Sequence, residues 1–547
     1  MKKLLSQHKW LLTLLLFVFA SIVSIYLTDL ANGHIWSYLG LDTDGRFHIM
    51  RMEGLYQSMK EGVLFPVVNM SFLGGFGYIS NVFYSNLWLY PAAILRFAGF
   101  SIAQSFVIYY VMLNFCTFLT SFFAYYRASH QYNKSLIFSF VYTLGAYSIF
   151  DMVRRFDVGE VLTLVFLPIV MLGIYEIFYA DDKKWLYLTV GMVAIIYSHA
   201  LSPILIAIFI VLVILFRLRT LIRQPRRILK LFYAGGTSLI LSLAYFLPII
   251  EQLKHTQFKL TSPLVDVVQR SSTLPELFSW SLTNNVNQQG IGLILILVAV
   301  MIPLVIWKVK TPVIRDFAII GEILLIMTTN IFPWKFFENT PLKMIQFPWR
   351  FNMIITILFA IFLASDPLKL FNRNWKRISL IVMTMLVTVV SEAALIKNNP
   401  NEYNSYASFD NVDTYSIGIG EEYLPKNANL TELRSTSHKP EVKSGSAIIS
   451  DFKQVGSKVS FQYQDAKNAK VDLPIIGYYG YSSKSSIGKV SQLKMDQKNN
   501  GLGTVTIHGN GAVKVNYYPT MIQQLSKLVS LMGLLVVSFI FVIRKKE

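Results

Sequence analysis

Apolar residues along this chain gather in long runs, which short polar stretches separate. A helix needs about 20 mostly apolar residues to cross the hydrocarbon core of a bilayer. Twelve runs approach or reach that length: 10–28, 104–124, 133–150, 161–180, 185–200, 203–216, 230–250, 289–307, 316–332, 350–365, 377–395 and 521–543. The pattern predicts a mainly α-helical, polytopic membrane protein of about twelve spans.

Basic residues cluster in the segments between alternate runs. If the N-terminus lies in the cytoplasm, every cluster falls on the cytoplasmic side, as the positive-inside rule requires. The clusters are "YYRASHQYNK", "DDKK", "FRLRTLIRQPRRILK", "WKVKTPVIR", "FNRNWKR" and "RKKE". We therefore expect a multi-pass cell-membrane protein with both termini in the cytoplasm. No small-x-small cleavage motif closely follows the first run, so we expect that run to be a retained helix.

The apolar stretch 82–100 is an exception, because Pro91 and Arg96 interrupt it. Counting it as a span would place "FRLRTLIRQPRR" outside, against the charge rule. We expect it instead to be a re-entrant or interfacial segment of a long first outer loop, 29–103. Within this loop, 44–61 carries an imperfect apolar face, which predicts an amphipathic helix on the membrane surface.

The stretch 396–520 differs from the rest in its polarity and its period-two alternation. "SKVSFQYQ" and "GAVKVNYYP" alternate, and "NNGLG" and "GNG" are typical of turns. These patterns predict an extracytoplasmic β-rich domain at 396–520. It would follow a transmembrane domain at 1–395 and precede a final transmembrane helix with a basic cytoplasmic tail at 521–547.

Composition narrows the classes of function. Of the 547 residues, 54% are hydrophobic and 15% charged, and the formal net charge is +19. Much of this charge lies in the predicted cytoplasmic loops, where it serves topology, so we expect no nucleic-acid partner. Cys116 is the only cysteine, which excludes an intramolecular disulfide and a cysteine-based metal site.

Four predicted outer loops carry polar residues suited to chemistry. They hold Asp42, Asp44, Arg46 and His48; Asp151, Arg154, Arg155, Asp157 and Glu160; His199; and Gln346, Trp349 and Arg350. A carboxylate can remove a proton from an attacking hydroxyl, and several carboxylates can hold a hard divalent cation. Arginine suits a phosphate, because its guanidinium binds in a bidentate manner and stays charged. Because all four loops are predicted on the same side of the membrane, the pattern favours one composite site.

Most of these residues also have a structural interpretation. Asp44 suits the first turn of the helix that follows it, and Asp42 suits a solvated loop. Arg154 and Arg155 suit contacts with lipid headgroups. His199 suits a hydrogen bond at a helix end, and "QFPWR" suits an interfacial anchor.

Four segments together carry a resemblance to known proteins. "DTDGRFHIMRMEGLYQSMKEGVLFP", with "RRFDVGE", "SHALS" and "IQFPWRF", resembles the bacterial membrane-protein family called "6-pyruvoyl-tetrahydropterin synthase related". Nothing in the chain resembles the soluble pterin enzyme itself. The architecture also resembles the GT-C superfamily of membrane glycosyltransferases, which have many spans, an essential acid in a long first outer loop and polyprenyl-phosphate-linked sugar donors. The stretch beginning "DLPIIGYYGYSS" is similar to the C-terminal β domain of Gram-positive relatives that glycosylate envelope polymers.

The resemblance implies an enzyme that moves a sugar from a polyprenyl-phosphate carrier to an envelope polymer or glycolipid at the outer face of the membrane. It matches the superfamily's first-loop acid to Asp44, with Asp42 beside it, and leaves the second-loop acid among Asp151, Asp157 and Glu160. Asp44 is expected to act as general base or to orient the acceptor. The other expected substrate contacts are Arg46, His48, Arg154, Arg155, Asp157, Glu160, His199, Gln346, Trp349 and Arg350. A divalent cation would find its ligands among Asp44, Asp151, Asp157 and Glu160.

One position departs from the pattern, and two other functions stay open. Thr43 stands where many relatives have a histidine before the matched aspartate, so metal use is undecided. A transporter or flippase of a lipid-linked glycan would place functional charges inside the spans. Glu176, Glu251 and Glu322 lie in or near apolar segments without an obvious partner, whereas the acids at the outer surface favour sugar transfer. The third function is a non-catalytic assembly factor.

Overall fold

The computed structural model describes residues 8–31, 39–40, 43–261, 266–404, 409, 411–418, 420–485 and 488–546. Asp42, one of the expected catalytic residues, lies outside the described residues. The chain divides into two compact units. The first comprises Met1–Gly45, Phe106–Leu239 and Pro263–Phe409, and the second comprises Arg46–Ser105, Ile240–Ser262 and Asp410–Glu547.

Helices make up most of the first unit. They are α2 (Lys9–Ala31), α6 (Ile102–Ser129), α7 (Tyr132–Thr143), α8 (Ala146–Ile149), α9 (Val158–Tyr179), α10 (Leu186–Ile196), α11 (Ser202–Arg223), α12 (Pro225–Leu241), α14 (Leu274–Leu282), α15 (Leu293–Val305), α16 (Pro312–Met327), α17 (Asn352–Ser365) and α18 (Asn374–Asn398). A short antiparallel pair joins β1 (Leu39–Gly40) to β2 (Tyr403–Asn404). Helices that are apolar on all sides belong in a buried core or a membrane.

The expected apolar runs are helical, and several have the dimensions of a membrane span. Within the described residues, six helices are long and apolar enough to cross a membrane, or up to eight if two bent pairs each form one span. The six include α6, α9, α11, α18, α17 with its preceding turn, and most of α21 (Met521–Lys546). The structure therefore supports a multi-pass membrane protein, and the count of twelve spans stays a prediction.

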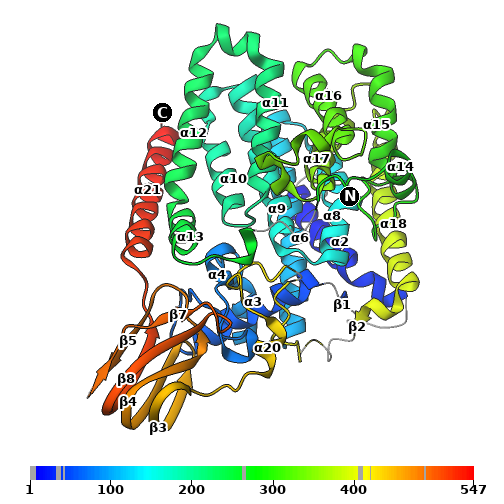
Figure 1. Cartoon of the computed structure of the whole chain (residues 1–547). Helices are drawn as coiled ribbons and strands as arrows, with labels where there is room; N and C mark the ends of the chain where they lie inside the picture. The colour runs from blue at the N-terminus through cyan, green and yellow to red at the C-terminus, as the bar shows by residue number, and fades with distance from the viewer. Residues whose placement is uncertain are drawn as a thin grey trace. The chain divides into compact units, whose positions relative to one another are not determined.

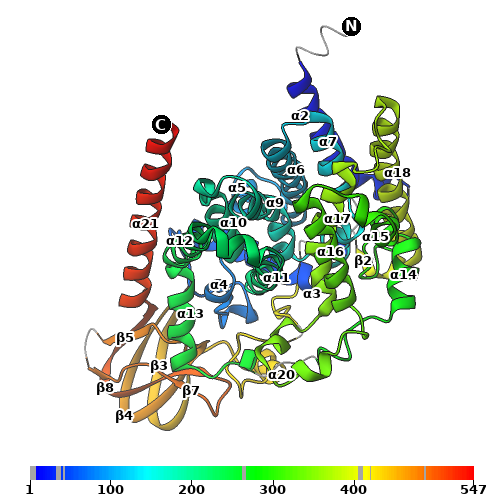
Figure 2. The ribbon, with the colours of Figure 1, turned by 90° about the horizontal axis from the view of Figure 1, so that it is seen from above.

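Close helix packing fixes α9, which carries part of the candidate site described below. α9 lies beside α10, α16 beside α17, and α18 beside α2 and α7 (Figures 1 and 2). A Cβ atom on Gly173 of α9 would come within 2.2 Å of the Leu188 backbone nitrogen, and one on Gly191 of α10 within 2.8 Å of the Val170 nitrogen. The two helices thus pack backbone against backbone, as small residues permit between membrane helices.

The second unit combines short helices with an antiparallel sheet. Its helices are α3 (Thr43–Lys60, which begins in the first unit), α4 (Ser80–Phe83), α5 (Tyr90–Phe97), α13 (Leu243–His255), α20 (Leu430–Ser435) and α21. The strands are β3 (Glu441–Val455), β4 (Lys458–Ile476), β5 (Tyr481–Ser485), β6 (Lys489–Val490), β7 (Lys494–Asp496) and β8 (Leu502–Tyr517). They run in the order β3-β4-β8-β5, and β6 and β7 also pair with β8 (Figure 1).

The sheet bears out the predicted C-terminal β structure and corrects one turn. The "SKVSFQYQ" segment lies in β4 and "GAVKVNYYP" in β8, with Phe461 opposite Val513. "NNGLG" forms the turn into β8, but "GNG" is not a turn, because β8 continues through it. There the register shifts between the Tyr463–Gly511 and Ala466–Gly509 pairs, so two residues of β4 lie opposite Asn510 and form a β-bulge. The boundaries 396 and 520 stay predictions.

The charged side of α3 is buried, whereas the amphipathic surface helix predicted for 44–61 would expose its polar face. Arg51 is 2% exposed and donates to the backbone oxygens of Tyr84 and Ser85 at 3.1 and 2.8 Å. Glu53 pairs with Arg96 at 2.8 Å. These partners come from 82–100, which forms two short helices rather than a span. Burial is tolerated because each charge is paired or hydrogen-bonded.

Candidate active site

The candidate site begins with an unusual backbone segment before α9. Residues Phe150–Arg155 form a π-helix, η2, and Phe156 follows it in the left-handed region with φ 53°. π-Helical turns and left-handed non-glycine residues concentrate at functional sites. Asp157 then caps α9, because its Oδ1 accepts from the backbone nitrogens of Gly159 and Glu160 at 2.9 and 3.2 Å. This path turns the side chains of Asp151, Arg155, Asp157 and Glu160 into one cluster.

Arg155 is the centre of this cluster. Its guanidinium lies 2.9 Å from Asp151 and from Asp157, 3.1 Å from Glu160 and 3.2 Å from Asp44. A guanidinium offers five N–H donors in a fixed plane, so it can serve several carboxylates at once. Its carbon also lies 4.9 Å from the centre of the Trp349 ring, within the range of a cation–π contact.

A second arginine extends the network through Glu160. Arg350 Nε donates to Glu160 Oε1 at 2.9 Å, and its Nη1 donates to the Ile345 backbone oxygen at 3.0 Å. Gln346 Oε1 also accepts from Arg350, at 3.3 Å. Gln346 itself has φ 61° and ψ −50°, a sparsely populated backbone region. The predicted "IQFPWR" and "RRFDVGE" segments therefore meet in the structure.

Exposure separates Asp44 from the other acids of the cluster. The Asp44 side chain is 40% exposed, against 0% for Asp151, 5% for Asp157 and 2% for Glu160. A general base must come within hydrogen-bond reach of the proton that it removes. Of these four described acids, Asp44 is the one that a bulky substrate reaches without rearrangement of the core. The three buried acids hold Arg155, which in turn orients Asp44.

Three side chains have the geometry of metal ligands. Ligand atoms of Asp157, Glu160 and His199 lie within 4.8 Å of one another. His199 comes from the turn before α11 and shares a 2.8 Å hydrogen bond between its Nδ1 and Ser202 Oγ. The carboxylates of this trio already contact the guanidinium groups of Arg155 and Arg350. A divalent cation would have to displace these guanidinium groups from the carboxylates of Asp157 and Glu160, so the trio is a poor fit for one. The expected candidates Asp44 and Asp151 lie outside the trio.

The structure gives other contacts or another unit for three further expected residues. His48 belongs to the second unit, where it is 2% exposed and its Nδ1 lies 3.0 Å from Arg51. Arg46 also belongs to the second unit. Arg154 is part-buried and donates to Asn287 Oδ1 at 2.5 Å. His48 is thus a buried packing residue of α3.

One member of the network was missed by sequence reasoning. The hydroxyl of Tyr147 donates to Glu160 Oε2 at 2.8 Å, so both oxygens of that carboxylate are held. Tyr147 lies inside an apolar run, where nothing distinguishes it from a core tyrosine. Only the tertiary structure brings α8, which carries Tyr147, to Glu160 of α9.

Comparisons with known proteins identify a relative and a structural likeness. No family model matches the chain. An uncharacterized protein of Lactococcus lactis subsp. cremoris (strain MG1363) is 22% identical over 561 residues, covering 87% of this chain and 87% of the relative. A cryo-EM structure of the mycobacterial arabinofuranosyltransferase AftD is 14% identical, with a TM-score of 0.42. The match covers 72% of this chain but 27% of AftD, so the chain spans about a quarter of that structure's length.

Proposed function

We propose that this protein is a membrane glycosyltransferase of the GT-C type, with Asp44 as its general base. The observation that carries the proposal is the contrast in exposure between Asp44, at 40%, and the buried acids whose shared arginine holds it. An accessible carboxylate with a fixed orientation suits proton removal at a membrane surface. Buried polar residues in a membrane protein are expensive and often mark function.

The transfer step uses a polyprenyl-phosphate-linked sugar as donor and a hydroxyl of an envelope polymer or glycolipid as acceptor. The acceptor oxygen forms a bond to the anomeric carbon of the sugar, and the bond from that carbon to the phosphate oxygen breaks. The hydroxyl proton passes to the Asp44 carboxylate, and the polyprenyl phosphate leaves with the electron pair. Arg154 is our candidate for contact with that phosphate, because it is only part-buried.

The buried arginines have a positioning role in this proposal. Arg155 and Arg350 lie 11% and 8% exposed and are already engaged by carboxylates. The sequence predicted both as substrate contacts, but their ion pairs favour support of Asp44 instead. Three further residues contact this network: His199 lies beside Asp157 and Glu160, Gln346 accepts from Arg350, and the Trp349 ring lies against Arg155.

The second unit holds a cavity of its own, which we propose as a binding site for a glycan segment. It has a volume of about 490 Å³ and is lined by Gly54, Gln57, Ser58, Glu61, Met70, Ser71, Gly75, His438, Phe452, Gln454 and Gly456. Hydroxyl, amide and carboxylate groups beside an aromatic ring suit the hydroxyls and the apolar face of a sugar. Partial burial lowers the pKa of His438, so it is neutral at pH 7. Glu61 is then the charged side chain of the lining. Because its carboxylate repels phosphate, the cavity suits a neutral glycan better than a phosphate-rich one.

The test of the proposal compares wild type with Asp44→Asn in a deletion strain. Asparagine keeps the size of the side chain and still accepts from Arg155, but it is a very weak base. We expect the sugar substituent of the envelope to fall about 10²- to 10⁴-fold, the usual contribution of a general base. The measurement is sugar composition of envelope polymers, at matched membrane levels of the protein.

Glu276→Gln provides the matched control. Glu276 lies in the first turn of α14 and outside the Arg155 network, so its neutralisation should leave the substituent at the wild-type level. Wild-type levels in Asp44→Asn would contradict the proposed base. If even the deletion strain retained every envelope sugar, a non-catalytic assembly role would replace the transferase.

One observation favours a second function, transport of a lipid-linked glycan. Glu392 lies in the candidate span α18, is 0% exposed, and neither carboxylate oxygen has a hydrogen-bond partner among the described residues. An ionisable residue inside a membrane span is a functional candidate by default. By contrast Glu176 pairs with Lys184, and Glu251 accepts from Thr520. A transporter predicts that Glu392→Gln abolishes function, whereas the transferase predicts that it leaves sugar transfer intact.

A further inference from the structure

A second cavity lies within the first unit, at the opposite end of α9 from Asp157 and Glu160. Its volume is about 250 Å³. It is enclosed by the end of α6, the start of α7, the second half of α9, the start of α16 and the end of α17. By the distribution of basic loops, all five of these helix ends are predicted to face the cytoplasm. The cavity is therefore distinct from the proposed active site.

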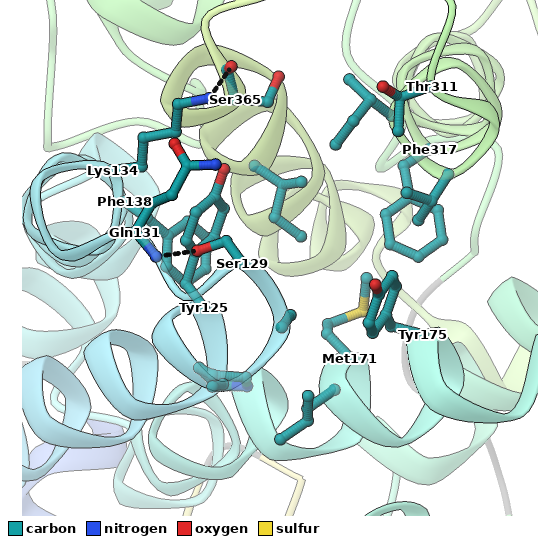
Figure 3. A pocket seen from close by; sticks show the side chains of 17 residues that line it. Tyr125, Ser129, Gln131, Lys134, Phe138, Met171, Tyr175, Thr311, Phe317 and Ser365 are labelled. Atoms are coloured by element: carbon teal, nitrogen blue, oxygen red, sulfur yellow. Dashed lines mark hydrogen bonds between the residues drawn. The ribbon is translucent and has the colours of Figure 1, made fainter. Parts of the chain in front are cut away.

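The lining is apolar except at one edge. Tyr125 and Phe138 stack with ring centres 5.0 Å apart on one side, and Met171, Tyr175 and Phe317 lie on the other (Figure 3). Aromatic and aliphatic side chains of this kind suit a hydrocarbon chain. Pro168 also lines the cavity, and a proline inside a helix loosens the backbone of the preceding turn.

The polar edge carries positive charge. Of the lining residues, Lys134 is the one with a charged side chain, and Ser129 and Gln131 lie on the same side of the cavity (Figure 3). Lys134 Nζ donates to the Ser365 backbone oxygen at 2.9 Å. An ammonium group has three hydrogens, so this bond leaves capacity for an anionic oxygen.

We propose that this cavity binds one acyl chain of an anionic phospholipid from the cytoplasmic leaflet, with its headgroup phosphate at Lys134. Charge complementarity supports this occupant, because basic pockets between membrane helices on the cytoplasmic side bind anionic headgroups. The segment before α16 adds Lys308 and Lys310, and Arg315 lies in the first turn of α16, 3.8 Å from Asp316. The acids next to lining residues are engaged elsewhere: Asp316 accepts from Tyr179 at 3.0 Å, Glu176 lies 3.3 Å from Lys184, and Asp366 accepts from the backbone nitrogens of Leu370 and Phe371.

The test titrates the detergent-solubilised full chain with phosphatidylglycerol and with phosphatidylcholine of the same acyl chains, followed by native mass spectrometry. Wild type should bind phosphatidylglycerol about fivefold more tightly, the factor expected for one basic residue near an anionic lipid. Lys134→Met, which keeps the apolar stem, should lose this preference. Ile314→Trp, which fills the cavity, should weaken both lipids.

Lys183→Met is the matched control, because Lys183 is an exposed lysine of another predicted cytoplasmic loop. It should bind as wild type does. Inorganic phosphate should not compete, since it has no chain to occupy the apolar part; competition would show a phosphate site instead of a lipid site. Equal binding of the two lipids to wild type, or equal losses in Lys183→Met and Lys134→Met, would overturn the proposal.

Discussion

Arg155 is the residue whose loss should damage the network most. Its guanidinium contacts four carboxylates, and three of these are at most 5% exposed. Removing one partner of a buried ion pair leaves an uncompensated charge, which costs about 3–5 kcal/mol. We expect Arg155→Met to lower the thermal unfolding temperature of the purified protein strongly and to abolish sugar transfer.

The neighbouring Arg154 serves as the control for that prediction. Arg154→Met removes the same charge and size one position earlier, and because Arg154 is only part-buried and donates to the neutral Asn287, a smaller loss of thermal stability is the expected result. Similar unfolding temperatures for the two variants would show that the four contacts of Arg155 contribute little.

Metal dependence can also be argued from single residues. The carboxylates of Asp157 and Glu160 face the guanidinium groups of Arg155 and Arg350, so a divalent cation would have to displace an arginine. We therefore expect the transfer rate to be unchanged by a chelator in excess, measured on membranes with a radiolabelled lipid-linked sugar. Loss of the rate in chelator and its recovery with added Mg²⁺ or Mn²⁺ would contradict this expectation.

Sequence reasoning could find most members of the network but not their partners. The acids and arginines were visible as polar residues of loops on one predicted side. The pairing of Arg155 with Asp44, 111 positions away, depends on the packing of the start of α3 against η2, which no local pattern encodes. The exposure that singles out Asp44 likewise follows from tertiary structure alone.

At the scale of the elements, the start of α9 combines two functions in Asp157. One of its oxygens caps the helix and the other pairs with Arg155. Asp157→Asn should keep the cap but lose the ion pair, whereas Asp157→Ala should lose both. Loss of an N-cap costs about 0.5–2 kcal/mol, so Ala should unfold at a lower temperature than Asn, and Asn at a lower temperature than wild type.

That order has a clear alternative outcome. If Asn and Ala variants unfolded at the same temperature, the capping bonds from Gly159 and Glu160 would add nothing to stability. Asp316→Asn and Asp316→Ala form a matched pair, because Asp316 is also buried and ion-paired but caps no helix start in the same way. The unfolding temperatures of the two Asp316 variants should differ less than those of Asp157→Asn and Asp157→Ala.

Elements were predicted best where composition alone decides them. The apolar runs form helices because a helix pairs its own backbone groups. A helix surface that is apolar on all sides then suits a buried or membrane environment. The buried face of α3 was not foreseen, because Arg51 is satisfied by the backbone oxygens of Tyr84 and Ser85, which leave no mark in the sequence. The bulge at "GNG" was mistaken for a turn because glycine and asparagine suit both.

At the scale of the whole molecule, the charge pattern predicts which parts face which side of the membrane. Basic residues are retained on the cytoplasmic side, which places "DDKK" inside and the strands between α18 and α21 outside. The protein has a single cysteine, Cys116, so a Cys116→Ser background allows cysteines to be placed one at a time. Ser450 in β3 and Lys183 in the "DDKK" loop are both exposed and suit this purpose.

A membrane-impermeant maleimide applied to intact cells should label Ser450→Cys and should not label Lys183→Cys. Both should be labelled once the membrane is permeabilised, which controls for the accessibility of each thiol. The reverse pattern would invert the molecule, placing the sheet and its glycan cavity in the cytoplasm. Transfer from a lipid-linked donor at the outer face would then be excluded, and the acidic network beside Asp44 would need an acceptor on the cytoplasmic side.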